Sequence, residues 1–206
     1  MDYTLDTKAA QAADQMGSRL DATGQYTGVF TRAEATTSKN GAEGIDFSFK
    51  SNDGLSADYL TVWTHGRDGK EIYGYKQLMA IMTCLKIKSL STKEGMIEKW
   101  DKETSGKVKV SATLYPDLMN KPIGLLLQRE DYLKKDQSEG HKMGIFAAFE
   151  ASTEFTASEI LGHKTSPELL DKMLAKLKDK PLQMSVSANY APSASFDSFE
   201  DEIPWF

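Results

Sequence analysis

One hairpin of alternating residues constrains the fold of this chain more than any other feature. In the run IDFSFK, residues 45–50, Ile45, Phe47 and Phe49 alternate with polar residues, which is typical of a strand with one buried face. The turn SNDG follows at residues 51–54, and Asp-Gly between two such runs favours an antiparallel hairpin. We therefore expect Phe47 and Phe49 in the core of a mainly β protein.

The rest of the chain supplies further strands around one central helix. The expected strands, in chain order, cover residues 25–34, 45–50, 56–64, 107–114, 123–130 and 142–150. A helix is expected over residues 75–86, where apolar residues recur three and four apart from Leu78 to Leu85. Three strands, a helix and further strands form the layout of an OB-fold, a small Greek-key barrel. An SH3-like barrel or a β-sandwich would give similar strand spacing.

Helices are also expected near both ends of the chain. Residues 5–20 place apolar side chains three or four apart, which is typical of a short amphipathic helix. Near the C-terminus, Ser166 can cap a helix whose first turn holds Pro167. An apolar stripe from Leu169 to Leu177 indicates the face of this helix that packs inward.

One charged segment, residues 91–106, shows no clear period, and we expect an inserted loop with a short helix over residues 96–102. Trp100, inside it, could stack on a ligand or pin the insertion to the domain. The expected parts of the chain are an N-terminal helical segment (1–22), an OB-like domain (23–150), a C-terminal helix packed on or beside it (151–180), and a flexible linker with an acidic tail (181–206).

Composition favours a soluble cytosolic protein with no cofactor. The longest uncharged apolar stretch, residues 77–85, is less than half of the roughly 20 residues that a membrane-spanning helix needs. The N-terminal residues lack the basic and apolar regions of a secretory signal. The single cysteine, Cys84, excludes an intrachain disulfide and is expected to fill core space.

Charge is distributed unevenly along the chain. The formal net charge is −5, and residues 193–206 carry four acidic residues and no basic one. Residues 60–142 instead hold 15 Lys and Arg against 11 Asp and Glu. A mildly basic middle with an acidic end fits a protein that contacts a polyanion with one part and imitates one with another, although a simple scatter of surface charge stays open.

Catalysis is not expected. His65, His141 and His163 stand beside glycines or in polar loops, without the pairing of a zinc site, and each is expected to be a solvated loop residue. The chain has neither a nucleophile elbow nor a Gly-rich phosphate loop. We therefore predict no metal site and no catalytic residues.

The third expected strand, ADYLTVWTH, is a candidate platform for stacking nucleic-acid bases. Leu60 and Val62 share one face, and Tyr59, Thr61 and Trp63 share the other. If the aliphatic pair faces inward, the aromatic rings face solvent, as binding of single strands requires; the alternative is that Tyr59 and Trp63 belong to the core. The candidate DNA-binding residues are Lys50, Tyr59, Trp63, Arg67, Lys70, Tyr73, Tyr75, Lys76, Lys107, Lys109 and Arg129.

The end of the chain, FDSFEDEIPWF, resembles the C-terminal tip of bacterial and phage single-stranded DNA-binding proteins, in which an acidic run precedes Ile-Pro-Phe. The matching residues are Glu200, Asp201, Glu202, Ile203, Pro204 and Phe206. Trp205 departs from the pattern, because it separates the proline from the terminal ring. The resemblance covers about a dozen residues, and the body looks more like divergent phage-encoded versions than the usual bacterial protein.

The resemblance implies a sequence-tolerant single-stranded DNA-binding protein that acts in phage DNA replication, recombination or repair, in the cytoplasm of the bacterial host. Its tip, residues Glu200 to Phe206 with Trp205 included, would recruit partner proteins. A homo-oligomer stays open. The alternatives are an adaptor that recruits enzymes through the tip without touching DNA and, third, a nuclease whose acidic residues bind magnesium.

Overall fold

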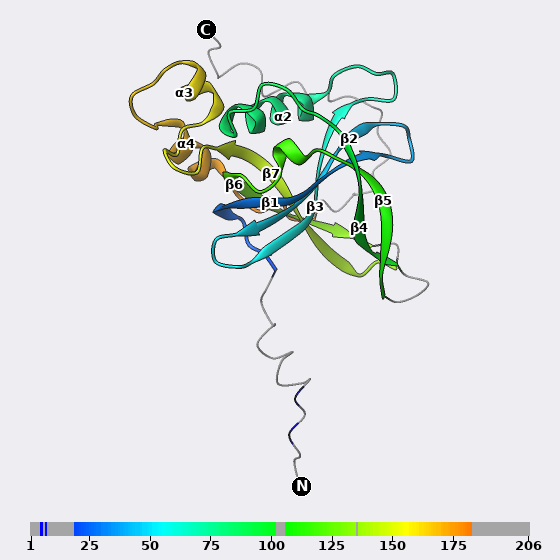
Figure 1. Cartoon of the computed structure of the whole chain (residues 1–206). Helices are drawn as coiled ribbons and strands as arrows, with labels where there is room; N and C mark the ends of the chain where they lie inside the picture. The colour runs from blue at the N-terminus through cyan, green and yellow to red at the C-terminus, as the bar shows by residue number, and fades with distance from the viewer. Residues whose placement is uncertain (1–4, 6, 8–18, 102–105, 135, 183–206) are drawn as a thin grey trace, which may run out of the picture.

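The structure is a computed structural model that describes residues 5, 7, 19–101, 106–134 and 136–182. Its backbone is mainly strand, arranged in one seven-stranded antiparallel sheet with short helices at its margins (Figure 1). The elements are β1 (Gly24–Thr37), β2 (Glu43–Ser51), β3 (Ser56–His65), α2 (Tyr73–Cys84), β4 (Lys93–Asp101), β5 (Gly106–Leu114), η1 (Pro116–Leu118), β6 (Pro122–Leu133), β7 (Glu139–Phe149), α3 (Ala157–Leu161) and α4 (Leu169–Lys176).

Strand β1 is the centre of the sheet because its two halves pair with different strands. Its residues 24–29 pair with β6, and its residues 28–37 pair with β2. β3 continues the sheet beyond β2, and β7 continues it beyond β6. Strands β3 and β7, at the two ends of this path, also lie close together. The sheet therefore curves around a single main core.

The main core lies on one face of β1, β2 and β3 and is rich in aromatic rings. Phe47 and Phe49 are buried, which confirms the prediction from their alternation. The ring of Phe30 on β1 lies 4.4 Å from that of Phe47 and 6.0 Å from that of Phe49, between ring centroids. Each ring of this kind buries a large apolar area, so the trio contributes much of the hydrophobic stabilisation.

Helix α2 follows β3, as predicted, and covers one side of the core. Its buried face includes Leu78 and Ile81, which are three apart and so share one side of the helix. Cys84 is also buried, and burial, with a smaller contribution from Glu150, raises the pKa of its thiol to about 12. The thiol is therefore unreactive at neutral pH and fills core space, as predicted.

Residues 91–106 differ from the prediction. Residues 93–101 form strand β4 and not a loop with a short helix, and β4 pairs with β5 along its whole length, from Lys93 opposite Leu114 to Asp101 opposite Gly106. The expected fourth strand is therefore one arm of a long hairpin, which projects from the side of the sheet (Figure 1). Pairing with β5 overrides the weak local pattern of β4, since strand propensity depends strongly on context.

The segment after β7 packs on β6 through a second, smaller apolar cluster. Leu170 and Leu177 of the α4 region bury against Leu126 and Phe149. The cap of α4 differs from the prediction, because the carboxylate of Glu159 accepts the first backbone N–H groups of the helix and no capping bond from Ser166 is present. A buried carboxylate there satisfies donors that an N-terminus leaves without helical partners.

The predicted N-terminal helix falls mostly outside the described residues, and so does the tail from residue 183 onward. Of the residues predicted as a helix, Thr7 is helical, but the last two are not: Arg19 forms an extended bridge with Ser56, and Leu20 is buried against the core. Within the described part of the chain, no helix has the length and apolar character needed to cross a membrane.

Candidate nucleic-acid interface

The face of β1, β2 and β3 that points away from the core is the candidate interface, and we call it the outer face. On β3, Leu60 and Val62 are buried, whereas Tyr59 is 57% exposed and Trp63 is half-buried. The predicted separation of aliphatic from aromatic residues is therefore confirmed, and the alternative that places both rings in the core is wrong. The outer face carries Arg32, Glu34, Asp46, Ser48, Lys50, Tyr59, Thr61 and Trp63.

Tyr59 lies on the outer face within a bulge of β3. Between the pairs Phe47 with Leu60 and Phe49 with Ala57, β3 contains one residue more than β2. Tyr59 has a φ of 61° there, a left-handed conformation that is unfavourable for a bulky side chain. The guanidinium carbon of Arg32 lies 5.7 Å from the centroid of the Tyr59 ring, which gives a cation–π contact. A strained residue thus presents an exposed ring beside a cation.

Trp63 lies at the opposite end of the outer face, across from Gly44. A Cβ at Gly44 would lie 2.4 Å from the carbonyl oxygen of Val62 and 3.0 Å from the Trp63 ring. Glycine is therefore required for this close approach, and the indole occupies the space that a side chain would otherwise take. The ring is held by its neighbours and stays partly open to solvent.

An ion-pair network that sequence reasoning missed occupies the middle of the outer face. Arg32 donates to Asp46 over 2.6 Å, and the Thr61 hydroxyl donates to the other oxygen of Asp46 over 2.7 Å. Glu34 accepts a 2.6 Å bond from the ammonium of Lys99, which lies on the separate hairpin β4–β5. Two cations and two carboxylates therefore neutralise each other at this position.

Exposed cations gather instead beside Trp63, in two neighbouring loops. The β1–β2 loop carries Lys39, and the β3–α2 loop carries Arg67 and Lys70, all three exposed. The loops touch, because a Cβ at Gly41 would lie 3.3 Å from the Arg67 side chain. Lys70 has an acidic neighbour, Asp68, at 3.2 Å, on the exposed surface where such pairs are weak. Glu43 and Glu71 are also exposed at this end, beside His65, so the loops present their cations among acidic residues.

The three predicted residues near the start of α2 differ from one another in exposure. Tyr73 is 70% exposed and Lys76 is exposed. Tyr75 is half-buried, and its ring meets the edge of the His65 ring at 5.7 Å between centroids. Tyr73 is thus the ring in this group most available for stacking.

Lys107 and Lys109 are exposed, as their alternation with Val108 and Val110 predicts. Lys99 stands directly opposite Val108 in the hairpin, and directly opposite residues share a side. Because Lys99 reaches Glu34, the side with Val108 turns toward the outer face and the side with Lys107 and Lys109 turns away. These two lysines are not brought together with Tyr59 and Trp63.

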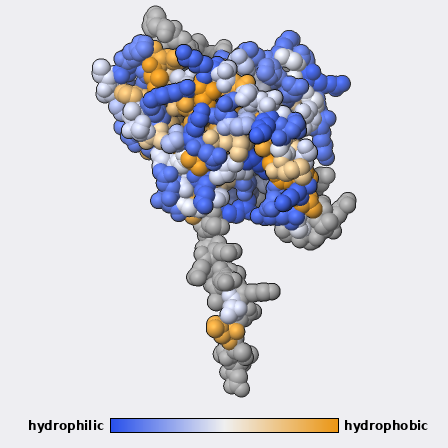
Figure 2. All heavy atoms as spheres, in the orientation of Figure 1, coloured by the Kyte–Doolittle hydropathy of each residue, from blue (hydrophilic) through white to orange (hydrophobic). Residues whose placement is uncertain are grey.

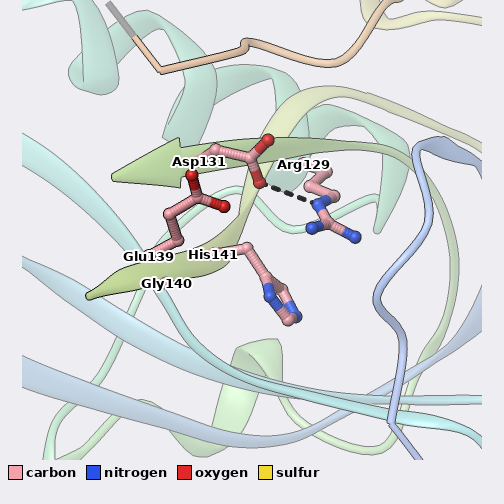
Figure 3. A pocket seen from close by; sticks show the side chains of 5 residues that line it. All are labelled: Arg129, Asp131, Glu139, Gly140 and His141. Atoms are coloured by element: carbon pink, nitrogen blue, oxygen red, sulfur yellow. Dashed lines mark hydrogen bonds and ion pairs between the residues drawn. The ribbon is translucent and has the colours of Figure 1, made fainter. Parts of the chain in front are cut away.

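Arg129 is engaged in local contacts beside a small polar hollow on the β6–β7 hairpin (Figure 3). Its guanidinium bonds Asp131 over 2.9 Å, which raises the pKa of the arginine further. The hollow measures about 200 Å³ and is also lined by Glu139, Gly140 and His141. With two carboxylates against one guanidinium, it is a poor receptor for phosphate.

Among the described residues, no group of three or more His, Cys, Asp or Glu side chains is arranged to hold a metal ion. The prediction that all three histidines lie in loops is wrong for two of them, because His65 ends β3 and His141 lies in β7. His65 is half-buried, and its Nδ1 lies 3.0 Å from the Thr64 hydroxyl.

The surface in the orientation of Figure 2 is mostly hydrophilic, with small groups of hydrophobic residues over α2, over α3 and at the lower right over the β4–β5 hairpin. Comparison of the sequence with protein-family models and with curated proteins gives no match. The function is therefore inferred from the residues of the chain itself and from the resemblance of its tip.

Proposed function

We propose that this protein binds single-stranded DNA with little sequence preference, through the outer face and the adjoining loops. The observation that carries the proposal is the arrangement of β3, which buries Leu60 and Val62 and leaves the rings of Tyr59 and Trp63 toward solvent. Bases stack on such rings irrespective of sequence, while Lys and Arg nearby contact the phosphates.

We further propose that β1, β2, β3, β6 and β7 with α2 correspond to an OB-type barrel, into which the β4–β5 hairpin is inserted. Three observations support this: α2 lies between the third and fourth of these strands, β1 pairs with both β2 and β6, and β3 lies close to β7. OB-folds bind oligonucleotides on the face of strands 2 and 3, which is where Tyr59 and Trp63 lie.

Two parts of the proposal depend on the resemblance of the tip alone: a phage origin with a role in DNA replication, recombination or repair, and recruitment of partner proteins by residues 200–206.

The cations best placed for phosphates are Lys39, Lys50, Arg67, Lys70 and Lys76. Tyr59, Trp63 and Tyr73 are the rings best placed for bases.

Titration of fluorescein-labelled oligo-dT with the full chain, followed by anisotropy at 50 and 200 mM NaCl, tests the proposal. We expect binding that weakens steeply with salt, because contacts to phosphates release counterions. Absence of binding at low salt, both for the full chain and for a variant that lacks residues 198–206, would overturn it.

One observation favours a second candidate, an adaptor that does not bind DNA. The cations in the middle of the outer face are neutralised by Glu34 and Asp46, and the whole chain carries a net charge of −5. If the protein is such an adaptor, the parent chain will not bind oligo-dT, and substitution of Trp63 or Lys50 will not change the anisotropy in the titration.

A further inference from the structure

Among the described residues, the β4–β5 hairpin is attached to the rest of the protein near its base and by the ion pair of Lys99 with Glu34. The strand register between β1 and β5 contains the single pair Glu34 with Leu114. Close to the base, the Ser91 hydroxyl and backbone N–H both bond the carboxylate of Asp117. Further along the hairpin, Lys99 reaches over to the side chain of Glu34.

The network that Lys99 joins is only partly satisfied. Glu34 is buried, with 8% of its side chain exposed, and its Oε2 has no hydrogen-bond donor among the described residues. The Nε of Arg32 is also buried without an acceptor and lies 4.0 Å from this oxygen. Lys99 is the most exposed member, with 41% of its side chain open to solvent. The bond from Lys99 is therefore the most solvent-exposed link of the network and the one that a competing anion reaches first. Its loss leaves the Glu34 carboxylate without a donor, a cost that new contacts of Lys99 and Arg32 have to offset.

A phosphate oxygen offers these cations what the network lacks. It would accept from the ammonium of Lys99 in place of Glu34, and from the unpaired Nε of Arg32 without breaking the bond of Arg32 to Asp46. The ring of Tyr59 beside Arg32 would stack on the base attached to that phosphate.

We propose that the β4–β5 hairpin is the movable half of the binding site. A single strand enters between the hairpin and the outer face, and its phosphates accept hydrogen bonds from Lys99, in place of Glu34, and from the Nε of Arg32. This inference rests on the proposed function. It assigns Lys99 and Arg32 as phosphate-binding residues, and Glu34 as the internal competitor that holds the hairpin closed in the free protein.

Two matched pairs of variants test the inference by oligo-dT titration of the full chain over a range of salt. Glu34→Gln removes the competitor and keeps its shape, while Glu98→Gln makes the same charge change on the hairpin side that carries Lys107. For Glu34→Gln we expect affinity to rise about five-fold at 0.1 M salt with the logarithmic salt slope unchanged, because the same phosphate contacts form without the internal competitor. For Glu98→Gln we expect less than about a two-fold change, since screening weakens its effect.

The second pair compares Lys99→Gln with Lys107→Gln. We expect Lys99→Gln to lower affinity about five-fold at 0.1 M salt and to flatten the salt slope by about 0.7, because one phosphate contact is lost. Lys107 faces away, so its variant should keep the parental slope. If Lys99 only pins the hairpin, its removal opens the site, and an unchanged slope or a higher affinity would overturn the inference.

Urea unfolding of each variant separates the loss of DNA contacts from a loss of folded structure. Lys99→Arg keeps the charge and should bind oligo-dT like the parent. If Glu34→Gln does not fold, the lysine pair alone decides. If the parent chain does not bind oligo-dT, both the proposed function and this inference are overturned. If the parent chain binds but the two variants of each pair bind alike, only the inference is overturned.

Discussion

The two additions to the central sheet, the β4–β5 hairpin and the α3–α4 segment, are attached in different ways. The α3–α4 segment buries Leu170 and Leu177 and is fixed by a buried carboxylate, Glu159, with both oxygens bonded. The hairpin depends on the half-exposed Lys99 and on Glu34, which has one oxygen without a donor. A completed buried network fixes its segment, whereas an incomplete one with a half-exposed member can exchange that member.

Truncation of apolar side chains should give the largest contrast between the two additions. Leu170→Ala removes a buried side chain from a closed cluster, and we expect a loss of about 2–5 kcal/mol in the free energy of unfolding. Val110→Ala, on the half-buried side of the hairpin, should cost less than about 1 kcal/mol. Urea unfolding at neutral pH measures both, and equal losses would refute the contrast.

The carboxylate of Glu159 should give the next largest effect. One oxygen accepts from the N–H groups of Glu168 and Leu169 over 2.6 and 2.9 Å, and the other accepts from the N–H and hydroxyl of Thr156 over 2.9 and 2.7 Å. In Glu159→Gln, an amide NH₂ replaces one acceptor and faces these donors. We expect a loss of about 1–3 kcal/mol at pH 7, while Glu168→Gln, exposed to solvent, should have little effect.

The cost of Glu159→Gln should also depend on pH. Burial acts to raise the pKa of Glu159, but the backbone N–H bonds and the Thr156 hydroxyl outweigh it, so the pKa lies below its ordinary value of 4.5. A lowered pKa adds stability that is fully present above pH 4.5 and is lost as the pH falls through the folded-state value. The difference between parent and variant should therefore be constant near neutrality and shrink in acid, and an increase in acid would contradict the assignment.

Substitution of Tyr59 tests whether the outer face binds bases. Movement of the hairpin has a role only if DNA binds this face. Its φ of 61° suits glycine better than tyrosine, so Tyr59→Gly should leave the free energy of unfolding close to the parental value. Loss of one stacking ring should weaken oligo-dT binding by about 1–3 kcal/mol. Tyr132→Gly, which removes an exposed ring from the β6–β7 hairpin, is the control and should bind like the parent.

Alternation predicted the strands whose two faces differ, such as β2 with Phe47 and Phe49 inward. It failed for β4, where Met96 on one side and Ile97 on the other give neither side a purely apolar character, so that only the partner strand defines the element. The capping role of Glu159 was also missed, because it joins residues nine and ten positions apart through a bend that no local pattern encodes.

The candidate site was predicted in part for a similar reason. Strict alternation from the buried Phe30 would turn Arg32 inward, but a bulge between these residues shifts the register, and Ala33 takes the inward position. Bulges redirect side chains in this way without a strong sequence signature. The contact of Lys99 with Glu34 joins residues 65 positions apart, and only the folded hairpin brings them together.

The smallest expected effect separates the two sides of the hairpin. Lys107 and Lys109 carry the same charge as Lys99 but stand on the side that faces away from Glu34 and Tyr59. Replacing both with Gln should change oligo-dT affinity at 0.15 M salt by less than about two-fold, because charges farther away than the Debye length of about 8 Å are largely screened. Glu98, which lies 4.0 Å from Lys107, already offsets part of their charge. A loss larger than that of Lys99→Gln would place the strand on the opposite side of the hairpin, and the outer face would then lose its role as the platform.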